Sequence, residues 1–178
     1  MKNRNIQFKP TAGVLIPLLL ACFAAVFISA ATPATAGDLV PFKATFTGSS
    51  TSGPGFPCAA LRSDIVGGGH ATHLGKFTTV QHHCFDPADP TLAFTEGFYT
   101  FTGANGDTIF GTYHGHLVPI IAPSVFAIVG EFTIEGGTGR FVGATGGGPA
   151  SGTTNVATGV PTLILDGVIS SPGSLHKH

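Results

Sequence analysis

The chain has 178 residues, of which 43% are hydrophobic and only 10% are charged, and its formal net charge at pH 7 is −1. It contains no stripe of Lys and Arg that a phosphate backbone could bind, so we expect no nucleic-acid partner. The 142 residues that follow the hydrophobic N-terminal segment are enough for one domain with its own core.

The first 36 residues have the order of features found in a secretory signal peptide. Three basic residues precede an apolar run over residues 12–31, and Ala34 and Ala36 then follow in the small-x-small arrangement that signal peptidase recognises. We therefore predict that this segment is cleaved, that the mature chain begins at Gly37, and that the protein is secreted or periplasmic.

Two other interpretations of this segment stay open. About twenty apolar residues could span a bilayer, but Pro17 and the small residues after the run favour cleavage, which would leave no stable membrane span. The sequence LLAC, which ends at Cys22, resembles a lipobox, so Cys22 could be lipidated instead of removed. The residues after Cys22 are apolar, however, where lipoproteins usually become polar.

Beyond residue 37, short β-branched and aromatic runs alternate with clusters of Gly, Pro, Asn and Asp, a pattern typical of an all-β domain. The predicted strands are residues 40–48, 61–66, 71–85, 92–103, 108–117, 125–134, 144–154 and 162–169. Residues 49–57 are predicted to form a loop, and the triple glycine at 67–69 to separate two strands. Because a barrel closes its own sheet edges, we predict an eight-stranded antiparallel β-barrel with Gly-rich turns, one domain over residues 37–178.

Cys58 and Cys84 are the two cysteines that remain after cleavage. In an exported protein one such pair is typical of a structural disulfide. Their wide spacing and the oxidising compartment favour this bridge over a reactive thiol pair or a pair of metal ligands.

The stretch IEGGTGRFVGATGGG, residues 134–148, contains glycines that could suggest a phosphate-binding loop. A dinucleotide fingerprint needs G-x-G-x-x-G at the start of a helix, but here three residues follow Gly139 before the next glycine, and ATGGGPASG cannot form a helix. No Lys-Ser/Thr pair follows, as a Walker loop requires. We therefore expect a sharp turn that places Phe141 in the core, with no cofactor, and we expect Arg140 to be solvated or to pair with a carboxylate such as Glu135.

The segment GGTGRFVGATG (136–146) also resembles the strand-turn-strand signature of the allene oxide cyclase and dirigent superfamily, whose members are eight-stranded antiparallel barrels. GHATHLGKFT (69–78), FTGANGDTIFGTYHG (101–115) and LILDGVIS (163–170) resemble the bacterial exported relatives of that group, in the expected order. The resemblance covers most of residues 59–170.

What this resemblance implies is the barrel and a possible interior cavity. Allene oxide cyclases cyclise an unstable fatty-acid epoxide inside the barrel, dirigent proteins guide the coupling of phenolic radicals, and both kinds often form trimers. A small apolar ligand and a homotrimer are therefore expectations for this chain. The pocket residues of these two families cannot be matched individually to positions in this sequence, so the resemblance implies no catalytic residue.

Asn105 and Gly106 are typical of a two-residue hairpin turn, which would place Phe101 opposite Phe110. One face of this hairpin then holds Tyr99, Phe101, Phe110, His114 and His116, and the other holds Glu96, Phe98, Ile109 and Tyr113. Either face could line the barrel, since both carry aromatic side chains. The candidate ligand-binding residues are Phe98, Tyr99, Phe101, Phe110 and Tyr113.

Two residues of this hairpin are candidate catalytic groups. Glu96 would be a general acid or base if it faced an apolar cavity beside Phe98 and Tyr113, and His114 would take this role if the opposite face were inward. The alternative is that the aromatic side chains are core and the polar residue lies at the barrel mouth, in water.

His114 and His116 would point to the same side of a strand, which is a common beginning of a metal site. Zinc needs at least a third ligand, which either His70 or His73 could supply, but not both. The ligand set is thus incomplete, and exposed strand histidines explain the same pattern.

Together these features predict an exported small barrel that binds a small apolar or aromatic molecule without turnover, or that serves a structural role, because no catalytic constellation is found. The first alternative is an isomerase or cyclase that acts on a hydrophobic substrate in the cavity. The second is a metal-binding protein that uses His114 and His116.

Overall fold

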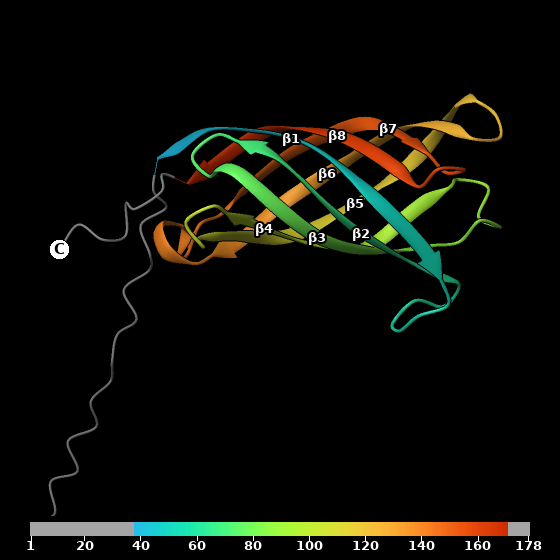
Figure 1. Ribbon diagram of the computed structural model, residues 1–178, viewed down its shortest axis with the longest axis horizontal. Coiled ribbons are helices and arrows are strands. Elements are labelled where there is room, and N and C mark those ends of the chain that lie inside the picture. Colours follow the sequence, from blue (N-terminus) through green and yellow to red (C-terminus); the bar gives the residue numbers. More distant parts are fainter. Residues whose placement is uncertain (1–37, 171–178) are drawn as a thin grey trace, which may run out of the picture. The chain divides into compact units, whose positions relative to one another are not determined.

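The computed structural model describes residues 38–170, which form a closed barrel of eight antiparallel strands (Figure 1). The strands are β1 (Leu39–Gly53), β2 (Leu61–Ala71), β3 (Gly75–Phe85), β4 (Ala93–Gly103), β5 (Thr108–Ile121), β6 (Val125–Gly137), β7 (Gly146–Asn155) and β8 (Val160–Ser170), with a short 3-10 turn η1 (Gly139–Phe141) before β7. Each strand pairs with its neighbour in the chain, and β8 pairs with β1. The predicted eight-stranded antiparallel barrel is confirmed. The predicted signal peptide and Cys22 lie outside the described residues.

Alternating side chains build the barrel wall. In β1, Phe42, Ala44 and Phe46 are buried, whereas the residues between them are exposed. The same alternation occurs in β8, where Leu165 and Ile169 are buried. Because successive side chains of a strand point to opposite faces, each strand contributes every second residue to the interior.

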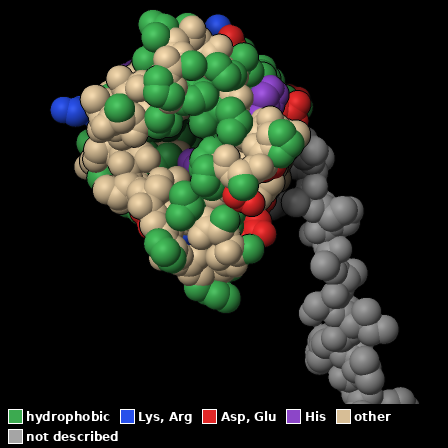
Figure 2. Space-filling model, turned by 90° about the vertical axis from the view of Figure 1, so that its right-hand side faces the viewer, with side chains coloured by type: hydrophobic (Ala, Val, Ile, Leu, Met, Phe, Trp, Pro, Cys, Tyr) green, Lys and Arg blue, Asp and Glu red, His purple; other side chains and the backbone are tan. Residues whose placement is uncertain are grey.

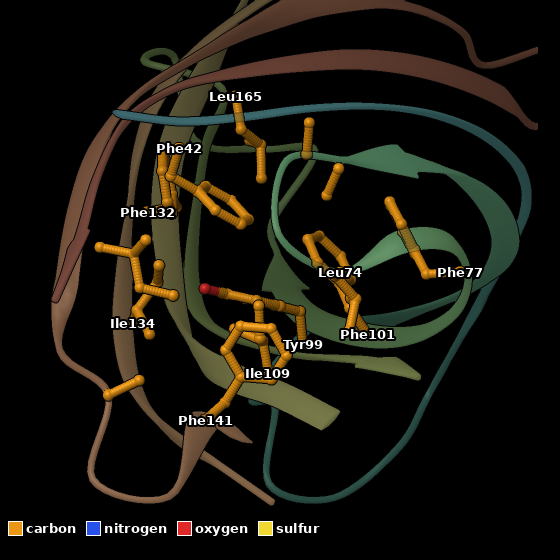
Figure 3. Close-up of a cluster of buried hydrophobic side chains, with 14 of the residues drawn as sticks. Phe42, Leu74, Phe77, Tyr99, Phe101, Ile109, Phe132, Ile134, Phe141 and Leu165 are labelled. Carbon is orange, nitrogen blue, oxygen red and sulfur yellow. The ribbon is translucent and has the colours of Figure 1, made fainter. Parts of the chain in front are cut away.

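One half of the barrel is filled by a hydrophobic core (Figure 3). Its fully buried large side chains are Phe42, Phe101, Phe141, Ile109, Ile134 and Ile169. Phe77 and Phe101 stack with ring centroids 4.3 Å apart. Phe141 enters this core from η1, as the sequence predicted, so the glycine-rich stretch is a turn that closes one end of the barrel.

Polar contacts fasten this closing turn to the neighbouring β4–β5 hairpin. Arg140 Nε donates to Asp107 Oδ2 at 3.0 Å, and Asn105 Nδ2 donates to the same oxygen at 2.8 Å. These contacts, first Asn105 and then Arg140, lower the pKa of Asp107. The carboxylate partner of Arg140 is therefore Asp107 and not Glu135, which instead accepts a hydrogen bond from Thr112.

Two sequence-based strand boundaries were wrong in the same part of the barrel. Residues 49–53, predicted as loop, continue β1, and the glycines at 67–69, predicted as a break, lie inside β2. Gly48 of β1 lies opposite Gly67 of β2, and a Cβ on Gly69 would collide with the backbone of Thr45. These glycines let β1 and β2 approach closely, so here they extend a strand pair instead of ending it.

The β4–β5 hairpin register also differs from the prediction by one residue. The loop has three residues, because Gly103 N donates to Asp107 O at 2.9 Å, and Gly106 has a positive φ of 85°. Phe101 therefore lies opposite Ile109, not Phe110. A one-residue shift changes which cross-strand residues share a face, so the predicted grouping of the hairpin side chains was wrong.

Candidate functional site

The half of the barrel away from the core encloses a cavity of about 420 Å³. This volume is within the range of roughly 300–1,000 Å³ typical of small-molecule pockets. Its apolar lining residues are Leu61, Ile65, Phe85, Phe94, Leu117, Ile128, Ala150, Val156, Pro161 and Leu163. Figure 2, which faces this end of the barrel, shows a hollow surrounded by hydrophobic side chains and by uncharged polar side chains or backbone.

The cavity exists because the inward side chains become smaller toward one end of the barrel, as β1 shows. In β1 the inward positions hold Phe42 and Phe46 in the core, but Ser50 and Ser52 at the cavity. Serine fills far less volume than phenylalanine, so the barrel interior cannot be packed solid at this end. The sequence thus places a filled end and a hollow end in one barrel.

Polar side chains of β1, β2 and β3 form one wall of the cavity. Ser52 Oγ and Ser63 Oγ are 2.6 Å apart, and the neighbouring Gln81 donates from Nε2 to Thr79 Oγ1 at 3.2 Å. In β6–β8, by contrast, Thr154 is the lining residue with a polar side chain at an inward position. The cavity therefore has a polar side on β1–β3, where the polar groups alternate with Leu61, Ile65 and Phe85, and a mainly apolar side on β6–β8.

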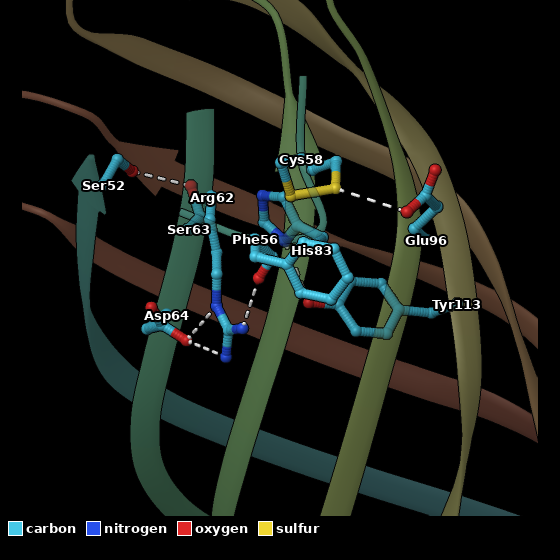
Figure 4. Close-up of a disulfide and its surroundings, with 10 residues drawn as sticks. Ser52, Phe56, Cys58, Arg62, Ser63, Asp64, His83, Glu96 and Tyr113 are labelled. Carbon is cyan, nitrogen blue, oxygen red and sulfur yellow. Dashed lines mark hydrogen bonds and ion pairs between the residues drawn. A yellow bond between two sulfur atoms is a disulfide. The ribbon is translucent and has the colours of Figure 1, made fainter. Parts of the chain in front are cut away.

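The polar side is completed by a hydrogen bond between His83 of β3 and Tyr113 of β5. His83 Nδ1 lies 2.9 Å from Tyr113 Oη (Figure 4). The ring of Phe94 packs against both, with its centroid 5.1 Å from that of His83 and 6.0 Å from that of Tyr113. Aromatic contacts at these centroid distances are favourable, and they hold the rings of His83 and Tyr113 in place.

Both members of this pair are uncharged at pH 7. Burial, and then the positive charge of His82, lower the pKa of His83 to about 4, although Asp64 acts in the opposite direction. Burial, and then the negative charge of Asp64, raise the pKa of Tyr113 well above its usual value. The pair is therefore a neutral hydrogen-bonding unit.

The hydrogen bond favours one tautomer of His83. A phenol O–H is a better donor than a neutral imidazole N–H, so we assign Tyr113 as donor to Nδ1, which leaves the proton of His83 on Nε2. Within residues 38–170, no buried side-chain nitrogen or oxygen lacks a hydrogen-bond partner. His83 Nε2 has no protein partner in this part of the chain, so it is open to the cavity that His83 lines.

The predicted ligand-binding residues divide among three places. Tyr113 lines the cavity, whereas Tyr99 and Phe101 belong to the filled core. Phe98 and Phe110 lie on the outer surface, where their rings stack with centroids 6.4 Å apart and Phe98 is 38% exposed. Of these five candidates Tyr113 is thus the one that lines the cavity, because the observed register puts it on the inward face with Tyr99 and Phe101.

Neither predicted catalytic residue presents its side chain to the cavity. Glu96 is exposed in a bulge of β4 with a φ of 52°, and its Oε2 is 3.6 Å from Cys84 Sγ. The bulge adds a residue to β4, so Glu96 leaves the regular alternation. His114 borders the cavity, but it is exposed and occupies an outward position next to Tyr113.

The candidate metal ligands His114 and His116 are both exposed on the outer face of β5. Within residues 38–170, no group of three or more His, Cys, Asp and Glu side chains could hold a metal ion. His70 lies in β2 and His73 in the β2–β3 turn, where His73 contacts the carbonyl of Pro41 at 3.0 Å.

The predicted disulfide between Cys58 and Cys84 is confirmed. Cys84 follows His83 in β3 and alternates with it, so the bridge attaches the β1–β2 connection to the outer side of the wall whose inner side carries His83 (Figure 4). Arg62 supports this connection, since it donates to the carbonyl of Phe56 at 2.9 Å and pairs with Asp64 at 2.8 Å.

The sequence prediction missed His83 and Gln81 as site residues. The available signal was the alternation Phe77, Thr79, Gln81, His83, which places all four on the inner face of β3. Along the inner face of β3, the apolar Phe77 comes first and polar residues follow. This order indicates that one end of the barrel is filled and the other is hollow.

No protein-family model matches this chain, and no curated protein and no solved structure is similar enough to count as a match. In the part of the chain that the structure describes, no helix is long and apolar enough to cross a membrane.

Proposed function

We propose that this protein binds one small, predominantly apolar and uncharged molecule in the cavity, without turnover. The observation that carries the proposal is the hollow end of the barrel, with a volume of about 420 Å³ and mainly apolar walls, where Ser, Gln, His and Tyr supply uncharged polar groups. Such a combination of apolar walls with a few polar groups is typical of ligand pockets. The resemblance to allene oxide cyclase and dirigent barrels supports the same proposal.

The electrostatics favour binding over acid–base catalysis. A general base works best when its pKa lies near the operating pH, whereas burial lowers the pKa of His83 to about 4 and raises that of Tyr113. Neither group exchanges protons readily at neutral pH. Both are suited to a stable hydrogen bond with a ligand.

We also propose that the protein acts outside the cytoplasm. The disulfide between Cys58 and Cys84 supports this, because structural disulfides persist in oxidising compartments. The N-terminal features of the sequence support the same location.

The cavity can be tested by filling it. Thr154 lies at an inward position of β7 and lines the cavity, whereas its neighbour Thr153 is exposed on the outer face. Thr154→Phe places a ring in the cavity, and Thr153→Phe is the matched control. The neutral dye N-phenyl-1-naphthylamine, which fluoresces strongly in apolar surroundings, is the probe.

We expect the wild type and Thr153→Phe to bind the dye with the same Kd, and Thr154→Phe to bind at least about tenfold more weakly, a loss of ~1.4 kcal/mol. Native mass spectrometry of the purified protein complements this titration by detecting a molecule that copurifies. Equal dye binding by both variants would contradict the proposed site.

A further inference from the structure

The polar side of the cavity points to a narrower class of ligand, and this step rests on the proposed function. We propose that the bound molecule is uncharged and carries a hydrogen-bond-accepting oxygen, such as the carbonyl of a ketone, aldehyde or ester, which accepts the Nε2–H of His83.

The first support is the direction of the available donor. Within residues 38–170, His83 Nδ1 is the hydrogen-bond partner of Tyr113 Oη, so the phenol O–H is satisfied by donating to Nδ1, and Nε2 then presents N–H to the cavity. A ligand that lacked an acceptor would leave this N–H without a partner once water is displaced. A buried donor without a partner is unfavourable, so an apolar hydrocarbon is disfavoured as the ligand.

The second support is the charge of the lining. Among residues 38–170, no Lys or Arg lines the cavity, and the one bordering carboxylate, Glu131, is exposed at an outward position of β6. A carboxylate or phosphate ligand would thus enter an apolar space without a positive partner, which is strongly unfavourable. The acceptor is therefore a neutral group, such as a carbonyl oxygen.

The third support is the opposite wall. Ile128 and Ala150 come from β6 and β7, which lie across the barrel from the β2 and β3 strands, and Leu163 comes from β8, which pairs with β1. A ligand that fits both walls has one polar edge and one hydrocarbon face. An aromatic or alicyclic carbonyl compound has this character.

A matched pair of probes tests the inference. The ketone is 6-propionyl-2-(dimethylamino)naphthalene, and its 6-propyl analogue has a CH₂ group in place of the carbonyl. Kd values for both are measured by isothermal titration calorimetry for the wild type, His83→Leu, and the control His82→Leu, which alters the neighbouring residue on the outer face of β3. The effect of His83→Leu on ketone binding minus its effect on binding of the propyl analogue isolates the contact between His83 and the carbonyl.

We expect His83→Leu to weaken ketone binding by about 2- to 12-fold, as for a neutral hydrogen bond, and to leave binding of the propyl analogue within about twofold. His82→Leu should change neither value. If His83→Leu does not fold, Tyr113→Phe serves as the second variant, since it frees Nδ1, lets the proton leave Nε2, and should reduce the same preference for the ketone.

The results separate this inference from the proposed function. If His83→Leu, or Tyr113→Phe in its place, weakens both probes equally or neither, the assigned hydrogen bond is wrong although the cavity still binds. Tighter binding of 6-(dimethylamino)-2-naphthoate than of the ketone at pH 7 would overturn the requirement for an uncharged ligand. If the wild type binds none of the three compounds at millimolar concentration, the proposed function fails, and this inference fails with it.

Discussion

Tyr113 reaches His83 across an intervening strand: the two residues lie on β5 and β3, yet Tyr113 Oη is 2.9 Å from His83 Nδ1. The residue of β4 opposite Tyr113 is Gly97, and a Cβ there would lie 2.8 Å from two carbons of the tyrosine ring. The absence of a side chain at Gly97 therefore lets the ring lie across β4, an arrangement in which an aromatic ring covers a glycine of the adjacent strand.

The same hairpin repeats this arrangement in the opposite direction. Tyr99 of β4 lies opposite Gly111 of β5, and its hydroxyl donates to the carbonyl of Thr133 on β6 at 3.0 Å. Tyr99 belongs to the filled core, and Tyr113 to the cavity. The two tyrosine–glycine pairs thus lie where the filled half of the barrel meets the hollow half.

Gly97→Ala is predicted to displace Tyr113 and to lower the free energy of unfolding by about 1–3 kcal/mol, as for overpacking in a well-packed interior. The added methyl group would meet both the ring and the backbone carbonyl of Tyr113, and the backbone cannot move aside easily. Gly53→Ala is the control, because a Cβ at that position has no atom within 4 Å. Urea unfolding followed by circular dichroism gives both values, and equal stability of the two variants would contradict the role of Gly97.

Lowering the pH is predicted to destabilise the protein through His83. Burial lowers the pKa of His83 to about 4 in the folded protein, whereas an unfolded histidine titrates near ~6.5. Between these values the unfolded chain binds a proton that the folded chain does not, so stability falls as the pH is lowered from about 6.5 to about 4. His83 adds no pH dependence above this window.

The full effect of this proton is about 3 kcal/mol, from ~1.4 kcal/mol for each tenfold change in proton affinity. The measurement is the free energy of urea unfolding between pH 4 and pH 8. His83→Gln should remove this part of the slope, and His82→Gln, on the outer face, should keep most of it. A slope that survives unchanged in His83→Gln would show that another group causes it.

The barrel and its filled core could be predicted because they depend on local patterns. Phe42, Ala44 and Phe46 alternate with polar residues, and β6 ends at Gly137, just before the turn that carries Phe141. Cys58 and Cys84 could be paired since only two cysteines follow the N-terminal segment. Strand number, closure and disulfide follow from composition and period alone.

The cavity could not be predicted because it depends on register and on single irregular residues. A loop of three residues at Asn105 and Gly106, instead of two, moved Tyr113 to the face of Tyr99. A bulge at Glu96 removed that carboxylate from the alternation of β4. The pattern of hydrophobic residues in the sequence reveals neither the loop length nor the bulge, since both faces of the hairpin carry aromatic side chains.

Removal of the disulfide is predicted to lower the free energy of unfolding by about 3 kcal/mol, mainly because the unfolded chain gains freedom. The bridge joins residues 26 apart in the sequence and attaches the β1–β2 connection to β3. The measurement is urea unfolding of the wild type with and without reductant, beside the variant with both Cys58→Ser and Cys84→Ser. Reductant should affect only the wild type, and any equal response of the double variant would point to a cause other than this bridge.

Phe141→Ala is predicted to cost about 3–5 kcal/mol of unfolding free energy, the usual range for a buried phenylalanine. Phe141 is fully buried, whereas Phe56, which provides the matched control Phe56→Ala, is 90% exposed and should change stability by less than about 0.5 kcal/mol. The two substitutions are compared by urea unfolding. Because Phe141 closes the filled end and does not line the cavity, the folded Phe141→Ala protein should bind N-phenyl-1-naphthylamine with the wild-type Kd. Weaker dye binding by the folded variant would mean that the core and the cavity are mechanically coupled.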